Sequence, residues 1–198
     1  MIVVGVTGSL SSGKSEAAAL FRKKGAVVFD ADVSARQALS KGSATHAAVL
    51  KLFGKSLAGT NGQLDRKKLA WHVFTHPEDL KKLNTLIHPG VIFDCLKVIS
   101  SNREREGVLV LDVPLLFESH MENLADYTVV VSASRPRILA RSKAKGIPPA
   151  LASKIIASQW PIAKKEKHAD FVIKNDGTKK ELEDKVSKIY NTILNLSR

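Results

Sequence analysis

The amino-acid sequence predicts an α/β fold in which a parallel sheet of about five strands carries helices on both faces. Short apolar runs alternate with helical patterns, and this alternation is typical of parallel sheets. The apolar runs are residues 2–6, 26–29, 108–111, 127–131 and 171–173. Ligands of such sheets bind beyond the carboxyl ends of the strands. The residues that follow each run are therefore the first candidates for a functional site.

The segment after the first apolar run has two glycines five positions apart, followed by Lys and Ser. It reads Gly-Ser-Leu-Ser-Ser-Gly-Lys-Ser over residues 8–15 and leads into an Ala-rich helical segment, which Gly25 is well placed to end. Such a loop directs backbone N–H groups and a helix N-terminus at one anion, whereas a plain Gly/Ser turn is the alternative. The predicted ATP-binding residues are Gly8, Ser11, Ser12, Gly13, Lys14, Ser15 and Glu16.

This strand, loop and helix predict a P-loop nucleoside triphosphate hydrolase fold. In that fold Lys14 would reach the β- and γ-phosphates, and the Ser15 hydroxyl would ligate Mg²⁺. Asp112 ends the third apolar run, where a Walker B acid would hold Mg²⁺ directly or through water. Asp30 and Asp32 follow the second run. Asp32 could accept a proton from an acceptor hydroxyl or cap the helix that follows, and the sequence leaves both roles open.

About 75 residues without a strand separate the second and third apolar runs, which predicts an inserted helical subdomain. Within it the pattern indicates a helix capped by Asp65, another that begins at Pro77 and is ended by His88-Pro89, and a further helix from Val91. We expect one domain of three parts. They are a nucleotide-binding core (1–32, 107–134 and 169–198), the helical insertion (33–106) and a lid (135–168).

The chain of 198 residues has 44% hydrophobic and 25% charged residues, which are ordinary globular values. No segment has the length of a membrane span or the features of a signal peptide. Cys95 is alone in an apolar pattern, which predicts a buried core thiol. We therefore expect a cytoplasmic protein with no membrane partner. The net charge of +12 is spread along the chain with only 6% aromatic residues. This favours a polyanionic small substrate over nucleic acid.

The predicted lid is basic. Ser134 can cap a helix that carries Arg141 and Lys145 one turn apart. The pattern predicts another helix that reaches Gln159 and is stopped by Pro161, and a second basic run ends at Lys167. A lid of this kind could close over phosphates. Arg141, with Arg137 as its rival, would neutralise charge on a transferring phosphoryl group, although a solvated helix face is the commoner role for an arginine. The predicted class is a phosphotransferase.

Two other functions remain open at this point. The first is another P-loop kinase that acts on a nucleoside, a nucleotide or a different small hydroxyl. The second is a nucleotide-dependent nucleic-acid binder, which the charge of +12 suggests. A switch GTPase is disfavoured, because Lys174-Asn175-Asp176 lacks the guanine-reading order Asn-Lys-x-Asp.

Several segments spread along the chain form one combined pattern. They are 6–15, Asp30-Ala31-Asp32, 62–66, Leu83-Asn84 with 87–89, 112–118, Gln159, Ala169-Asp170 and Asn175. Together, these segments resemble the dephospho-coenzyme A kinases nearly from end to end. The resemblance implies transfer of the ATP γ-phosphate to the ribose 3′-hydroxyl of dephospho-coenzyme A, with Mg²⁺, Asp32 as the base and Arg141 reaching the phosphates. The implied acceptor-site residues are Asp32, Asn84, His88, Pro89 and Leu115.

Two departures from the family pattern affect the site. Members of the family usually have glycines where this chain has Ser9 and Ser11, and left-handed backbone at a serine costs about 1 kcal/mol or more. The lid usually presents two arginines four positions apart, whereas here Arg141 is followed by Lys145. Lysine cannot form the two-pronged contact that arginine makes with a phosphate.

Overall fold

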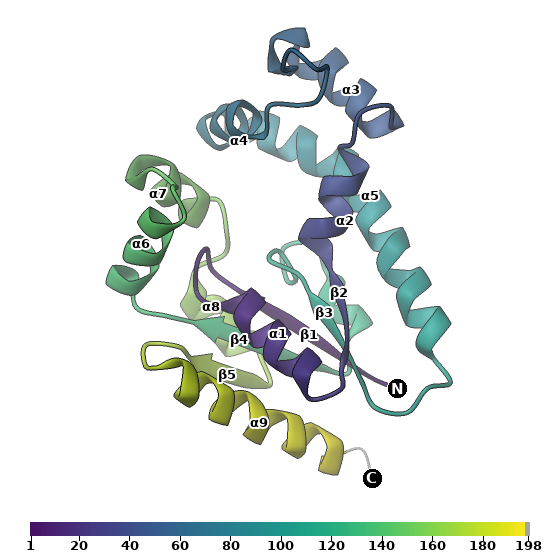
Figure 1. Ribbon diagram of the computed structural model, residues 1–198, viewed down its shortest axis with the longest axis vertical. Helices are drawn as coiled ribbons and strands as arrows, with labels where there is room; N and C mark the ends of the chain where they lie inside the picture. The colour runs from purple at the N-terminus through teal and green to yellow at the C-terminus, as the bar shows by residue number, and fades with distance from the viewer. Residues whose placement is uncertain (197–198) are drawn as a thin grey trace. The chain divides into compact units, whose positions relative to one another are not determined.

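The computed structural model describes residues 1–196 and contains a five-stranded parallel sheet with helices packed on it (Figure 1). The strand order is β2-β3-β1-β4-β5, so β1 is the central strand. This architecture confirms the predicted P-loop α/β fold. The strands are β1 (Ile2–Gly8), β2 (Val27–Asp30), β3 (Val108–Asp112), β4 (Tyr127–Ser132) and β5 (Phe171–Lys174).

The helices and two short 3-10 turns connect these strands (Figure 1). The helices are α1 (Lys14–Lys23), α2 (Ala31–Ala38), α3 (Ala44–Phe53), α4 (Arg66–Thr75), α5 (Pro77–Asn102), α6 (Arg135–Ala144), α7 (Pro149–Ala157), α8 (Ile162–His168) and α9 (Lys179–Leu196). The 3-10 turns are η1 (Lys55–Leu57) and η2 (Met121–Leu124).

One face of the sheet forms the main core with α1 and α9. Alternate residues of β1, β3 and β4, among them Val4, Val110 and Val129, are fully buried against side chains such as Phe21 of α1 and Val186 of α9. This alternation follows from the two-residue period of a strand. On the opposite face Leu116 lies so close to β1 that a Cβ at Gly5 would be 2.8 Å from its side chain. Both faces of the sheet are therefore covered, as its strand sequences predict.

The C-terminal end of α1 is fixed by Gly25. Its backbone N–H donates to Arg22, while the N–H of Ala26 donates to Phe21, and the φ of Gly25 is +97°. These two bonds form a Schellman motif, which needs a left-handed residue at this position. The prediction that Gly25 ends the first helix is confirmed, and the motif turns the chain directly into β2.

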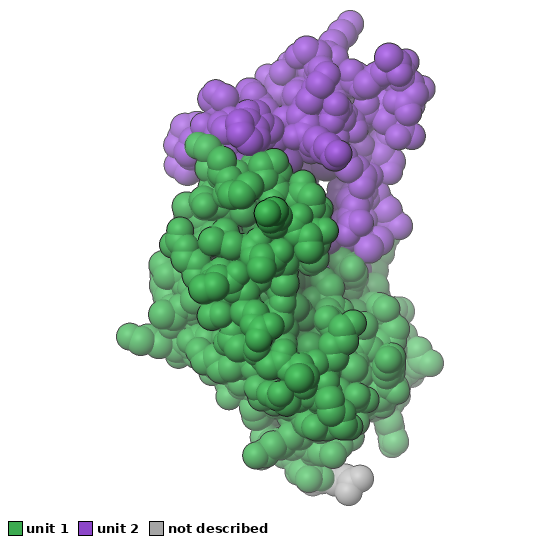
Figure 2. Space-filling view, turned by 60° about the vertical axis from the view of Figure 1, so that its left-hand side comes forward, with its two compact units in different colours: residues 1–30, 97–198 green, residues 31–96 purple. Residues whose placement is uncertain are grey.

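The chain divides into two compact units, residues 1–30 with 97–198 and residues 31–96, which Figure 2 draws in different colours. We refer to them as the sheet unit and the helical unit. The sheet unit holds all five strands with α1 and α6 to α9. The helical unit holds α2, α3, α4 and most of α5.

The predicted helix end at His88-Pro89 is wrong, because α5 runs unbroken from Pro77 to Asn102. A buried stripe at four-residue spacing, Leu83, Ile87, Val91 and Cys95, continues past the proline, and burial of this stripe stabilises one continuous helix. Pro89 itself is exposed. Water can therefore hydrogen-bond the carbonyl that lacks its helical partner.

The segment after β4 also differs from the prediction. The helix expected to reach Gln159 ends at Ala157, and a separate helix, α8, follows it. Pro161 was interpreted as a helix stop, yet it occupies the N-cap position of α8 with extended backbone. Proline suits the start of a helix because its missing N–H has no intrahelical partner there.

Candidate active site

The phosphate loop connects β1 to α1, and two of its glycines have no room for a side chain. A Cβ at Gly8 would lie 2.3 Å from the carbonyl oxygen of Val131 and 2.6 Å from Ser12 Oγ. A Cβ at Gly13, where φ is +100°, would lie 2.1 Å from Asn175 Nδ2. Both glycines of the motif are thus required by the close approach of neighbouring atoms, and at Gly13 also by a left-handed backbone.

The two serines that replace the usual glycines behave differently. Ser11 is left-handed, with φ at +53°, and it is one of two non-glycine residues with positive φ in residues 1–196. Ser9 is not among them, so left-handed strain applies to Ser11 alone. The Ser142 hydroxyl of α6 donates to Ser11 Oγ at 3.0 Å, and this bond ties the strained residue to the predicted lid.

Lys14 and Asp112 form a buried ion pair between the start of α1 and the end of β3. The two residues are 8% and 2% exposed, and Lys14 Nζ contacts Asp112 Oδ1. The parallel register of β1 and β3 brings their carboxyl ends to one edge, with Val6 opposite Asp112. The predicted phosphate-binding lysine and the predicted Walker B acid therefore meet at the position that the sheet rule indicates.

The carbonyl of Ser12 is held by two side chains from distant parts of the sheet unit. Arg141 Nη1 donates to it at 3.2 Å and Asn175 Nδ2 at 2.8 Å. Arg141 Nη2 also donates to the Asn175 carbonyl at 3.0 Å. Arg141 thus contacts the phosphate loop, while its rival Arg137 is exposed on the same helix.

Asn175 was not predicted as a site residue. In the sequence it opens an Asn-Asp-Gly run, which is typical of a turn after a strand. In the structure it is buried directly beside Gly13, and its backbone N–H donates to Ser132 at 2.7 Å. Only the family resemblance, which includes Asn175 among its segments, could have identified it as a site residue from the sequence.

A second ion pair lies close to the first. Lys165 of α8 is fully buried, and its Nζ is 2.8 Å from Glu118 Oε1 and donates to the Pro114 carbonyl at 2.9 Å. Burial lowers the pKa of Lys165, the Glu118 carboxylate raises it, and the nearby positive charge of Lys14 lowers it further. Sequence reasoning missed this pair because Lys165 lies in a basic run that reads as solvent-exposed.

Ser15 and Glu16 open α1 and are both exposed. Glu16 Oε1 lies 3.4 Å from Lys179 Nζ in a solvent-exposed pair, so its carboxylate is already partnered at the surface. The Ser15 hydroxyl and the Asp112 carboxylate are hard oxygen donors of the kind that Mg²⁺ prefers. Within residues 1–196 no cluster of three or more His, Cys, Asp or Glu side chains could hold a metal ion. The residues present fit Mg²⁺, which keeps waters and phosphate ligands rather than an all-protein cage.

The helical unit carries four of the five predicted acceptor residues. Asp32 is exposed in the first turn of α2, which begins at Ala31, so it lies inside the helix and does not cap a helix from Val33. Asn84 and His88 are half-buried one turn apart on α5. Burial lowers the pKa of His88 below its ordinary value, which keeps the ring neutral at pH 7.

The remaining acceptor residues are Pro89 and Leu115. Pro89 is exposed on α5, one residue beyond His88. Leu115 belongs to the sheet unit and is half-buried three residues beyond Asp112. Nothing in the sequence except the family resemblance distinguishes these two apolar residues from ordinary packing positions.

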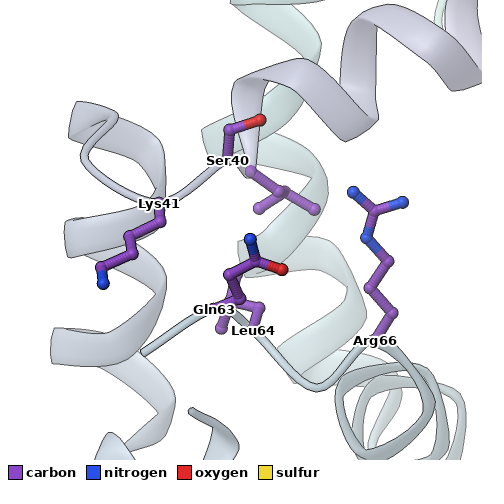
Figure 3. Close-up of a pocket in the computed structure, with 6 residues that line it drawn as sticks. Ser40, Lys41, Gln63, Leu64 and Arg66 are labelled. Carbon is purple, nitrogen blue, oxygen red and sulfur yellow. The ribbon is translucent and has the colours of Figure 1, made fainter. Parts of the chain in front are cut away.

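A pocket in the helical unit lies between the end of α2 and the start of α4 (Figure 3). Gln63 projects between two cationic side chains, Lys41 and Arg66, and Lys41 Nζ donates to the Asn61 carbonyl at 2.9 Å. The lining residues are Leu39, Ser40, Lys41, Gln63, Leu64 and Arg66. None of the predicted acceptor residues lines this pocket. Gln63, Leu64 and Arg66 belong to residues 62–66, one of the segments that carry the family resemblance.

No helix within residues 1–196 is both long and apolar enough to cross a membrane. The single cysteine, Cys95, is fully buried in α5, and burial raises the pKa of its thiol to about 11. The thiol therefore stays protonated and unreactive at neutral pH. The prediction that Cys95 is a core thiol is confirmed.

The five-stranded parallel sheet, the glycine-bounded phosphate loop and the buried Lys14–Asp112 pair define a P-loop kinase, which is a phosphotransferase that uses ATP. Residues 2–181 match the family model described as dephospho-CoA kinase. The chain therefore belongs to the dephospho-CoA kinase family, whose reaction is the last step of coenzyme A biosynthesis.

Individual relatives agree with this assignment. The chain is 36% identical to the dephospho-CoA kinase of Enterococcus faecalis over 190 residues, which is 94% of each protein. It is 38% identical to the dephospho-CoA kinase of Geobacillus kaustophilus over 182 residues, covering 91% of this chain and 90% of the relative.

Solved structures give the same result. A Thermus thermophilus protein superposes with a TM-score of 0.80 at 32% identity, over 98% of this chain and 97% of that one. The Campylobacter jejuni dephospho-CoA kinase superposes with a TM-score of 0.70 at 26% identity, over 99% and 98%. A shikimate kinase from Bacteroides thetaiotaomicron, at 13% identity and a TM-score of 0.56, shares the fold.

Proposed function

We propose that this chain carries out the reaction of its family with the residues described above. It transfers the γ-phosphate of ATP to the ribose 3′-hydroxyl of dephospho-coenzyme A and releases coenzyme A and ADP. The observation that carries the proposal is the preformed phosphate loop, with Lys14 buried against Asp112 and Arg141 on the loop carbonyl. A loop of this kind positions phosphates and stabilises transferred charge, which is most of what phosphoryl transfer requires.

On the ATP side, the backbone N–H groups of the loop and the start of α1 receive the phosphates. The residues with this role are Gly8, Ser11, Ser12, Gly13, Lys14, Ser15 and Glu16. Lys14 reaches the β- and γ-phosphates when they displace part of its contact with Asp112. Arg141, already next to the loop through Ser12, neutralises charge on the transferring group.

Mg²⁺ is the proposed metal, with the Ser15 hydroxyl and the Asp112 carboxylate as its protein ligands, the latter directly or through water. When bound, the ion neutralises charge on the phosphate oxygens. Asp112 pairs with Lys14. The same carboxylate thus fixes the lysine and supplies an oxygen for the ion.

On the acceptor side, Asp32 is the proposed general base. As the ribose 3′-oxygen forms its bond to the γ-phosphorus, the bond to the β-phosphate oxygen breaks, ADP leaves, and the hydroxyl proton passes to the Asp32 carboxylate. Asp30 lies opposite Asp112 in the β2–β3 register, and Asp32 follows Asp30 by two residues. Asn84, His88, Pro89 and Leu115 complete the proposed acceptor site.

The predicted parts of the domain keep their proposed roles. The insertion 33–106 helps to hold the acceptor, and the lid 135–168 covers the phosphates and carries Arg141. ATP and dephospho-coenzyme A are the proposed partners, with no nucleic acid, and the proposed location is the cytoplasm. The basic composition favours these polyanionic ligands.

The test is ADP release with ATP and Mg²⁺ in the presence of dephospho-coenzyme A, adenosine, AMP or no acceptor, with the product identified by mass. We expect release that depends on dephospho-coenzyme A, and one added phosphate on that acceptor. Release without an acceptor, or a preference for adenosine or AMP, would overturn the proposed substrate and leave only an ATP-using P-loop enzyme.

A further inference from the structure

The ammonium group of Lys165 on α8 is unusual because it is fully enclosed by protein. It is 2.8 Å from Glu118 Oε1 and 2.9 Å from the Pro114 carbonyl. Removing an ion pair from water has a large desolvation penalty, and apolar residues of similar volume are often as stable or more so. Packing alone therefore does not explain why a lysine occupies this position.

The partners of Lys165 connect it to the backbone on both sides of the phosphate site. The Pro114 carbonyl, two residues beyond Asp112, also accepts from Thr7 Oγ1 at 2.9 Å. Thr7 directly precedes the first glycine of the phosphate loop. The Pro114 carbonyl thus joins the Lys165 ammonium to Thr7, which leads into the loop, and to the segment that follows β3.

Glu118 extends this network to the segment before α8. Its Oε1 atom accepts from the Trp160 backbone N–H at 2.8 Å as well as from Lys165. The Trp160 ring stacks on Phe117 with centroids 6.0 Å apart. Three contacts therefore hold residues 114–118 against residues 160–165. They are the ion pair, the hydrogen bond from the Trp160 backbone N–H and the ring contact.

Lys165 is also electrostatically coupled to the phosphate-binding lysine. The charge of Lys14 contributes to the lowered pKa of Lys165, after burial and against the effect of Glu118. Two buried lysines, each paired with its own acid, therefore bracket the segment from Asp112 to Glu118. A change of charge at one lysine is felt at the other.

We propose that Lys165 is a positioning residue for phosphoryl transfer, a role that rests on the proposed function. Through Glu118 and the Pro114 carbonyl, its ammonium group fixes the segment that follows β3 and thereby the orientation of Asp112 relative to the phosphate loop. It touches neither substrate. It acts by holding the groups that do.

Lys165→Met tests this role. The methionine fills a similar volume without charge, so Asp112 loses part of its orientation, and we expect kcat to fall by about 10²-fold, the scale associated with a misplacement near 1 Å. The KM for ATP should change little, because the loop N–H groups that bind ATP remain. The matched control is Lys188→Met, the same exchange at an exposed lysine on α9, with expected wild-type kcat and melting temperature.

A structural role is separated from a positioning role by two further variants. Lys165→Met leaves the half-buried Glu118 carboxylate without this cation. The double variant Lys165→Met/Glu118→Gln removes that negative charge, keeps an acceptor for Trp160 and should recover much of the melting temperature. We expect its kcat to stay low. Glu118→Gln alone is the mildest change, and its kcat should lie between those of the wild type and Lys165→Met.

Recovery of kcat together with the melting temperature in the double variant would overturn the proposal, as would a raised KM for ATP with normal kcat. If Lys165→Met does not fold, Glu118→Gln decides, and an unchanged kcat there would also overturn it. These outcomes concern Lys165 only. A wild-type protein without ADP release dependent on dephospho-coenzyme A would instead overturn the proposed function.

Discussion

The phosphate loop and the helical unit hold their polar residues in opposite ways. Around the loop, Lys14 and Asp112 are buried against each other, and the Ser12 carbonyl accepts from two side chains. In the helical unit, Asp32 is exposed, and Asn84 and His88 are half-buried. The loop is held by contacts within the protein, whereas Asp32, Asn84 and His88 remain at least partly accessible to solvent.

Apolar side chains show the same contrast. Among residues 1–196, five of the seven large apolar side chains that are exposed belong to the helical unit: Val33, Leu52, Trp71, Phe93 and Leu96. The two in the sheet unit are Val172 and Leu196. We therefore expect substitutions at the phosphate loop to alter stability and catalysis together, and substitutions at acceptor residues to alter catalysis with little change in stability at neutral pH.

The largest combined effect is expected for Lys14→Ala. It removes the cation that binds phosphate and breaks the buried ion pair with Asp112. Breaking a buried pair typically destabilises a protein by about 3–5 kcal/mol. Phosphoryl transfer should be lost, and denaturant unfolding should show the lower stability. Lys14→Arg keeps the charge and should retain more stability. An Ala variant as stable as the wild type would contradict the description of a tightly coupled loop.

Asp32→Asn should show the opposite separation. The carboxylate is exposed, so the melting temperature and ATP affinity should stay near wild type, while turnover falls by about 10²- to 10⁴-fold as expected for loss of a general base. Calorimetric ATP titration and steady-state kinetics measure the two effects. Normal turnover would remove Asp32 from the base role.

Arg141→Lys should lower the rate more than it weakens ATP binding. Arginine donates from two nitrogens to Ser12 and Asn175, and lysine cannot reproduce this planar geometry. We expect a kcat lower by about tenfold or more, since an arginine in this role is worth about 10³- to 10⁵-fold. Arg137→Lys on the exposed side of α6 is the matched comparison. A larger loss there would move the role to Arg137.

A smaller effect is expected for the strained serine. Ser11→Gly and Ser11→Ala both lose the bond from Ser142, but only glycine relieves the left-handed backbone at φ +53°. The glycine variant should be more stable than the alanine variant by about 1 kcal/mol. Equal unfolding midpoints for the two variants would show that the backbone at this position carries no strain.

The smallest effect concerns pH. Burial lowers the pKa of His88 below the ordinary 6.5. Just below pH 6.5 the imidazole is therefore protonated in the unfolded chain and still neutral in the folded chain. His88 therefore contributes stability above about pH 6.5, and that stability is lost as the pH falls through the lowered pKa. Unfolding at several pH values should show a shallower acid loss for His88→Gln than for the wild type. An acid loss in His88→Gln as steep as that of the wild type would contradict this prediction.

The sequence predicted the sheet and the loop because both depend on local patterns. Five apolar runs became five parallel strands, and the glycine spacing located the loop between β1 and α1. The predicted helix end at Pro89 was wrong, because burial of the apolar stripe on both sides of the proline stabilises one continuous helix. Tertiary burial decides such cases, and no short window of sequence contains it.

The contacts that complete the site were harder to predict. Asn175 and Lys165 lie in segments whose local composition indicates a turn and a basic surface. Their roles in the structure come from partners distant along the chain, Ser12 for Asn175 at 163 positions and Glu118 for Lys165 at 47 positions. Asp32 was identified as a candidate base from its place after the second apolar run, whereas Asn84 and His88 were identified only through the family resemblance. The roles of all three stay predictions.

The Ser12 carbonyl has a consequence for how the protein is made. The phosphate loop is synthesised among the first fifteen residues, but Arg141 and Asn175, which hold its carbonyl, are synthesised much later. Contacts between segments so far apart form late in folding. On the ribosome, the nascent chain therefore has its ATP-binding sequence long before it has an ordered nucleotide site, and it gains that site only when β5 joins the sheet.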